Sequence, residues 1–178
     1  LAVLGGKILS QGRGVALATW QRSASVMNVP RSLTWLLIVA ASLYLVGFVV
    51  AGSLRLTYAY PFDRTEEASV DVLRHILHGE PAYGPPTLSY VPVVYPPLYF
   101  YVAAIAASFT GASLLPLRLV SLLASLMGGA LVFGLVRRET NNRALGLVSA
   151  ALFAGSTHVS LTSLDLARVD SLGTTFML

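Results

Sequence analysis

The sequence contains no cysteine and few charged residues, and both shortages narrow what the chain can be. Without cysteine, disulfides, thiol nucleophiles and cysteine-ligated zinc or iron are excluded within these residues. Charged residues make up 11% of the chain, whereas a soluble domain carries about 25%. So little charge cannot cover a water-facing surface when 55% of the residues are hydrophobic. We therefore expect the lipid bilayer to be the solvent.

Acidic residues are also missing from the whole segment before Asp63. The basic residues gather at the ends of apolar runs and do not form a groove with interleaved aromatics. The net charge of +4 is therefore an orientation signal and not a nucleic-acid footprint. The positive-inside rule places residues 1–32 in the cytoplasm. The residues before Met27 have no clear period, and we expect either an upstream extension or a cytoplasmic tail there.

The apolar residues come in runs long enough to cross about 30 Å of hydrocarbon as helices. These runs predict an all-α, polytopic membrane protein. The transmembrane part is expected over 33–178, with spans at about 33–54, 119–136 and 144–164 and the start of another at about 171.

The segment between the first two spans, 55–118, is expected to form a loop outside the cytoplasm. The turn at Arg137–Arg143 carries three arginines and belongs inside. The apolar run 95–111 then cannot cross, because a crossing would place those arginines outside. We expect it to be an interfacial helix, with crossing as the alternative. A second juxtamembrane helix is predicted over 66–78, with polar and apolar residues on opposite faces.

Asp63 stands just before this second helix, with Glu66 three positions later. This is the pattern of a helix N-cap, so Asp63 is either a cap or a functional carboxylate. His75 and His78 are three residues apart with no further metal ligands around them, which does not favour a metal site. His158 lies in an apolar run, where a hydrogen bond to a neighbouring helix is the expected role.

Several short motifs then follow in a fixed order. They are Ile-Leu-His-Gly-Glu-Pro-Ala-Tyr (76–83), Tyr-Pro-Pro-Leu-Tyr (95–99), Leu-Arg-Leu-Val-Ser (117–121), Arg-Arg at a span end and Arg-Val-Asp-Ser-Leu (168–172). By their order and spacing, residues 31–178 resemble the start of a GT-C-fold glycosyltransferase. That family includes protein O-mannosyltransferases and the lipid A aminoarabinose transferase.

The resemblance implies where the site residues lie. In this family a carboxylate of the first outer loop acts as base or metal ligand, usually within an Asp-Glu pair. Here Asp63 is followed by Arg64, and the acidic pair is Glu66-Glu67, so the assignment stays between Asp63 and Glu67. Asp63 is also the candidate ligand of a divalent cation, Mg²⁺ or Mn²⁺. At the outer end of the third span Asp170 is expected to be catalytic, ahead of Asp165.

The implied function is the transfer of a sugar from polyprenyl phosphate to a lipid, glycan or protein acceptor outside the cytoplasm. The protein would be a multi-pass enzyme of the plasma or inner membrane, with membrane lipids as neighbours and no nucleic-acid partner, and this chain alone would be inactive. Cationic and polar side chains would bind the donor; the candidates are Arg64, Arg118, Arg168 and Tyr95. The alternatives are a transporter or flippase and a non-catalytic membrane subunit. Arginines at these positions can equally be headgroup contacts.

Overall fold

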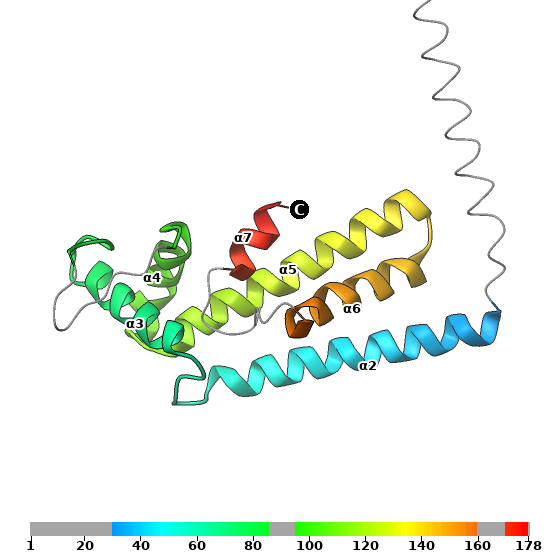
Figure 1. The fold of residues 1–178 in the computed structure, drawn as a ribbon, viewed down its shortest axis with the longest axis horizontal. Helices are drawn as coiled ribbons and strands as arrows, with labels where there is room; N and C mark the ends of the chain where they lie inside the picture. Colours follow the sequence, from blue (N-terminus) through cyan, green and yellow to red (C-terminus); the bar gives the residue numbers. More distant parts are fainter. Residues whose placement is uncertain (1–29, 86–94, 160–169, 178) are drawn as a thin grey trace, which may run out of the picture. The chain divides into compact units, whose positions relative to one another are not determined.

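A computed structural model of the chain describes residues 30–85, 95–159 and 170–177. The described residues form helices and contain no strand, which confirms the expected all-α class. The chain divides into two compact units, residues 1–36 and 37–178, and the described part of the first unit forms the first turns of a helix. The described helices are α2 (Arg31–Leu56), α3 (Arg64–Leu77), α4 (Leu98–Thr110), α5 (Leu114–Thr140), α6 (Arg143–Val159) and α7 (Asp170–Met177) (Figure 1).

Helices α2 and α5 are long and apolar enough to cross a membrane. They contain 26 and 27 residues, which corresponds to about 40 Å of helix each. The predicted spans 33–54 and 119–136 lie inside them. Helices α4 and α6 are shorter apolar helices. The end of the predicted span 144–164 lies partly outside the described residues.

Two asparagines produce the sharp turn between α5 and α6. Asn141 ends α5 in the left-handed region, at φ 51°, a conformation that asparagine tolerates better than most residues. The Asn142 side chain then accepts hydrogen bonds from the amides of Ala144 and Leu145, at 2.9 and 3.3 Å. It therefore caps the start of α6, and the short turn makes α5 and α6 antiparallel neighbours.

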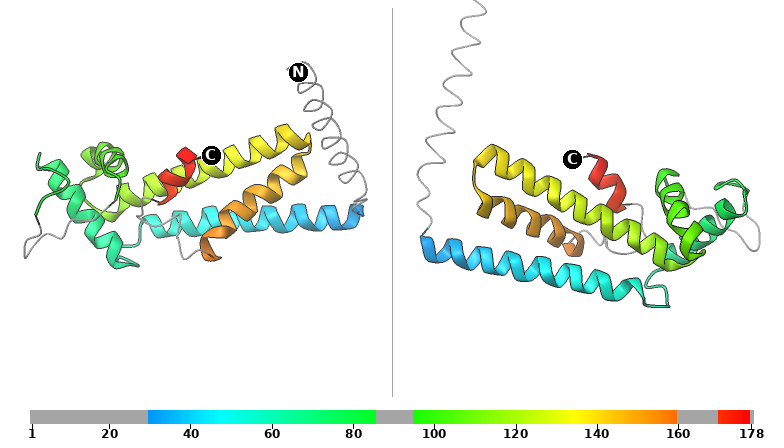
Figure 2. Two further views of the ribbon diagram at one scale, coloured as in Figure 1. Left: turned by 45° about the horizontal axis from the view of Figure 1, so that its top comes forward. Right: turned by 180° about the vertical axis from the view of Figure 1, so that it is seen from behind.

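Helix α5 is the centre of the packing. Helices α3, α4, α6 and α7 all contact it, and the views in Figure 2 show α6 running back along it while α3 and α4 gather at its N-terminal end. The main apolar core lies at that end. Most of its members come from α3, α4, α5 and α7, and they include Leu73, Phe100, Leu117 and Leu172.

Helices α3 and α4 are each followed by a glycine with positive φ. Gly79 follows α3 at φ 75°, and Gly111 ends α4 at φ 83°, backbone conformations that glycine adopts without steric cost. The predicted helices 66–78 and 95–111 correspond to α3 and α4. The observed α4 begins later, at Leu98, because Pro96 and Pro97 precede its first turn.

Candidate functional site

A buried ion pair joins α3 to α5. Arg118, in the second turn of α5, donates from Nε to Glu66 Oε1 at 2.9 Å and from Nη2 to Glu66 Oε2 at 2.7 Å. Both side chains are completely buried. Such a two-pronged arginine–carboxylate contact fixes geometry as well as charge. Glu66 therefore lies on the packed face of α3, against α5.

Arg118 also holds the backbone that connects α2 to α3. Its Nη1 donates to the carbonyl oxygens of Arg55 and Tyr58, each at 2.7 Å, and its Nη2 donates to that of Tyr60 at 2.9 Å. A guanidinium has five N–H donors, and here each has a protein acceptor. The Phe62 ring lies over the same guanidinium, 5.0 Å from its centroid, a distance typical of a cation–π contact.

A second polar group is buried beside this pair. The Tyr99 hydroxyl of α4 donates to the Leu117 carbonyl at 2.9 Å and lies 2.9 Å from the Ser121 hydroxyl of α5. Burial raises the pKa of the Tyr99 hydroxyl well above its ordinary value; the hydrogen bond to Ser121 lowers it, and the Glu66 charge raises it further. Tyr99 is therefore held in its neutral form, and it ties α4 to the N-terminal part of α5.

Asp63 stands at the N-cap position of α3, as the sequence predicted. Its backbone is extended and its side chain makes no capping bond to the helix. Instead, its carboxylate accepts from the Thr65 hydroxyl at 2.9 Å. Glu66, which completes the capping pattern, accepts from the amide of Phe62 at 2.8 Å. Glu66 thus bonds the amide of the residue before the N-cap, whereas in the usual capping pattern it would bond the amide of the N-cap residue itself. Arg64, the next residue after Asp63, is exposed.

A polar cleft of about 320 Å³ lies next to α3, and Glu67 lines it. Asp71 and Arg74 line it too, and they form an ion pair at 2.9 Å. The facing wall comes from the turn between α4 and α5, including Ser113. Of the two carboxylates that the sequence left open, Glu67 lines the cleft, whereas Asp63 is not among its lining residues.

The start of α7 lies at the same end of α5 as α3. Leu172 belongs to the buried core with Leu117 and Tyr99, and the Thr175 hydroxyl donates to the Ala124 carbonyl at 2.7 Å. Helix α7 therefore runs along α5 in the same direction, so its first residue, Asp170, lies toward the α3 end. Arg168 and Asp165 lie outside the described residues. Tyr95 is half-buried before α4, and its carbonyl accepts from the Tyr83 hydroxyl.

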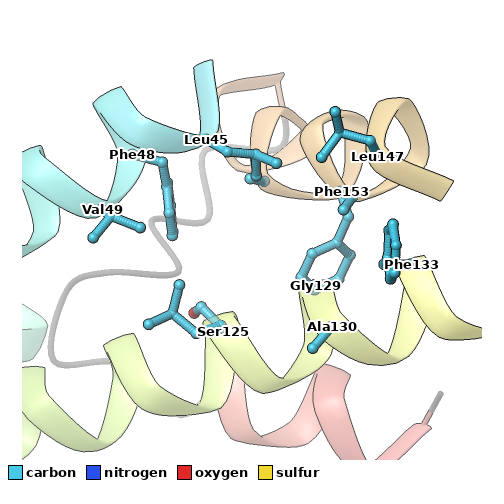
Figure 3. Close-up of a pocket in the computed structure, with 12 residues that line it drawn as sticks. Leu45, Phe48, Val49, Ser125, Gly129, Ala130, Phe133, Leu147 and Phe153 are labelled. Atoms are coloured by element: carbon cyan, nitrogen blue, oxygen red, sulfur yellow. The ribbon is translucent and has the colours of Figure 1, made fainter. Parts of the chain in front are cut away.

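A second cavity, of about 270 Å³, lies between α2, α5 and α6 and is apolar (Figure 3). Phe48, Phe133 and Phe153 line it, and the only polar side chain in its lining is that of Ser125. The Ser125 hydroxyl donates to the Ser121 carbonyl at 2.8 Å. This cavity offers space for hydrocarbon, and its lining carries no ionisable group.

Metal-ligating side chains do not cluster in the described part of the chain. No group of three or more histidine, aspartate or glutamate side chains is placed to hold a cation there. The role of Asp63 as a ligand of a divalent cation stays a prediction.

The position of Glu66 in the sequence already indicates that it is buried and needs a partner, although the capping pattern alone does not reveal this. Glu66 is four residues before Val70 and seven before Leu73, so it shares their apolar face. A carboxylate on a buried face requires a cation. Arg118 follows an apolar stretch at the start of α5. From the sequence we predict that it binds the donor, and we therefore do not pair it with Glu66.

The evidence for the family resemblance comes from the C-terminal part of the chain. Residues 94–178 match the family model described as dolichyl-phosphate-mannose-protein mannosyltransferase. The predicted resemblance to a glycosyltransferase is confirmed. The match covers α4 to α7 and includes Arg118, while Asp63, Glu66 and Glu67 precede it. No curated protein and no solved structure matches the chain.

Proposed function

We propose that the protein transfers a sugar from polyprenyl phosphate to a lipid, glycan or protein acceptor on the non-cytoplasmic face of a membrane. The observation that carries the proposal is the match of residues 94–178 to a mannosyltransferase family that uses a lipid-linked donor. The glycosyltransferase class and the general type of donor follow from that match. We propose in addition the class of acceptor, the membrane face on which transfer takes place and the residues that carry it out.

Two features support the multi-pass arrangement. Arg118 and Arg137 are separated by a distance of about 28 Å along α5, which matches the thickness of a hydrocarbon core. Helix α4 has 13 residues, about 20 Å of helix, which is too short to cross. One face of α4 carries large apolar side chains exposed in the described structure, as expected for a helix lying in the interface; they are Leu98, Tyr101, Ile105 and Phe109.

The proposed face follows from charge. The basic turn with Arg137, Arg138 and Arg143 connects α5 to α6, and the positive-inside rule assigns it to the cytoplasm. Helix α3 packs at the other end of α5. The cleft beside Glu67 and the start of α7 at Asp170 would then both lie outside.

The reaction requires little chemistry from the protein. The acceptor hydroxyl oxygen attacks the anomeric carbon, the bond from that carbon to the phosphate oxygen breaks, and polyprenyl phosphate leaves with the bonding electrons. A carboxylate takes the hydroxyl proton. We assign this role to Glu67, because it lines the polar cleft, and keep Asp63 and Asp170 as the other candidate carboxylates. Arg64, Arg168 and Tyr95 are the proposed contacts to donor phosphate.

The test is transfer of radiolabelled sugar from polyprenyl phosphate by the full-length protein in membranes. Glu67→Gln, Asp63→Asn and Asp170→Asn are compared with the parent at equal membrane insertion. A matched control is Glu80→Gln, which removes a carboxylate of the same loop that lies 3.2 Å from His75. We expect Glu67→Gln to lose about 100-fold or more in rate and Glu80→Gln to keep the parent rate. A parent without transfer from any polyprenyl-phosphate sugar contradicts the function, and full activity in all three variants removes the site.

A further inference from the structure

We infer that Arg118 is a positioning residue of this site and not a ligand of the donor phosphate. It holds the backbone between α2 and α3 together with Glu66, and through Glu66 it fixes the first turn of α3, where the proposed base lies. This inference rests on the proposed function for its kinetic part. Its structural part stands on the contacts of the Arg118–Glu66 pair.

The donors of Arg118 are already committed. All five N–H groups are directed at protein acceptors, and the side chain has no exposed surface. To bind a phosphate, Arg118 would have to break these bonds and withdraw its charge from the buried Glu66 carboxylate. Removing one partner of a buried ion pair is strongly destabilising. Arg118 is therefore unavailable to a substrate in this conformation.

The acceptors of Arg118 come from three consecutive parts of the chain. Arg55 is in the last turn of α2, Tyr58 and Tyr60 are in the connection, and Glu66 is in the first turn of α3. One side chain of α5 thus sets the path of the chain from the end of α2 into α3.

The aromatic side chains of the connection add to this arrangement. The guanidinium of Arg118 lies over the Phe62 ring, 5.0 Å from its centroid, and the Tyr58 ring stacks on Phe62 with 4.8 Å between the centroids. The Phe62 amide is bonded to Glu66 as well. A change at Arg118 therefore moves the connection and Glu66 together, and Glu67 is the next residue.

Lysine cannot replace this arginine. An ammonium group has three donors at one point, whereas the guanidinium is a planar fork with five donors. Lysine at position 118 retains the charge that a phosphate would need. It loses the geometry that serves three carbonyls and a carboxylate at once. The Arg118→Lys substitution therefore separates the two roles.

The experiment measures kcat and the donor KM of the full-length protein in membranes, for Arg118→Lys and Glu66→Gln. The matched control is Arg137→Lys, an exposed arginine at the other end of α5. A displacement of about 1 Å at a reacting group lowers the rate about 100-fold. We expect both variants to lose about that factor in kcat while the donor KM changes less than about threefold, and the control to match the parent.

A second measurement is independent of activity. Amide hydrogen exchange is followed for residues 55–66 in the same three variants and the parent. We expect the Phe62 amide to exchange faster in Arg118→Lys and in Glu66→Gln, and at the parent rate in Arg137→Lys. This result would support the positioning role even if the parent transfers no sugar, in which case the proposed function alone fails.

Two results would overturn the inference. In the first, the donor KM rises about tenfold or more in Arg118→Lys while Glu66→Gln behaves like the parent, which would assign Arg118 to the phosphate. In the second, exchange in residues 55–66 is unchanged in both variants, which would show that the pair does not hold the connection.

Discussion

The two ends of helix α5 both carry arginine, but they hold it in opposite ways. At the N-terminal end, Arg118 is completely buried and bonded to α3 and to the connection from α2. At the C-terminal end, Arg137 and Arg138 are exposed. The comparison shows that an arginine near the end of a long apolar helix is not always an orientation signal. Its partner on another helix decides whether it holds the fold together or faces water and headgroups.

The largest difference between the two ends should appear in stability. Arg118→Met leaves Glu66 buried without its cation, which costs about 3–5 kcal/mol. Arg137→Met removes an exposed charge and should stay within about 0.5 kcal/mol. Thermal unfolding of the purified protein in detergent measures both. Equal unfolding midpoints for the two variants would show that the buried Arg118 does not contribute more to stability than the exposed Arg137.

The C-terminal part of α5 should depend on close packing against α6. A Cβ at Gly146 of α6 would lie 2.9 Å from the backbone oxygen of Phe133, whereas one at Gly134 would meet nothing within 4 Å. Gly146→Ala is therefore expected to destabilise by about 1–3 kcal/mol. Gly134→Ala should stabilise by up to about 1 kcal/mol, because alanine is the better helix former. Denaturant titration followed by circular dichroism checks the pair, and equal effects of the two substitutions would show that the contact between position 146 and Phe133 does not limit stability.

The neutral Tyr99 hydroxyl makes the N-terminal end sensitive to alkali. Tyr99→Phe loses two buried hydrogen bonds, at a cost of about 1–3 kcal/mol at neutral pH. Because the folded-state pKa of Tyr99 lies above the unfolded value, its contribution is complete below pH of about 10. The contribution is lost as pH rises further. Stability measured between pH 7 and 11 should therefore fall less steeply above pH 10 in Tyr99→Phe than in the parent; parallel curves would contradict the assignment.

The smallest effect is expected at the second arginine–carboxylate pair of α3. Arg74 and Asp71 lie 2.9 Å apart, but both are substantially exposed. Exposed pairs of this kind contribute about 0–1 kcal/mol and are screened by salt. Arg74→Gln should change the unfolding midpoint little, and less at high ionic strength. A loss as large as that of Arg118→Met would mean that exposure does not distinguish the two pairs.

The sequence predicted the helical class and the places of the long helices, because apolar runs and charged flanks are local signals. It predicted α3 and its N-cap at Asp63 for the same reason. The Glu66–Arg118 pair was not predicted, since it joins residues far apart in the chain and depends on how α3 packs on α5. Helix α4 begins at Leu98 and not at the predicted residue 95, because Pro96 and Pro97 precede its first turn. The sequence leaves the choice between Asp63 and Glu67 open, and the proposed assignment to Glu67 rests on the cleft, which only the fold provides.

We propose that the two ends of α5 face different compartments, with the site at the outer end. The absence of cysteine allows single introduced cysteines in this chain to report their own positions. His78→Cys, just after α3, and Glu139→Cys, at the end of α5, both replace exposed residues. In intact cells a membrane-impermeant maleimide should label position 78, and should label position 139 only after the membrane is opened. Labelling of both positions in intact cells would contradict the claim.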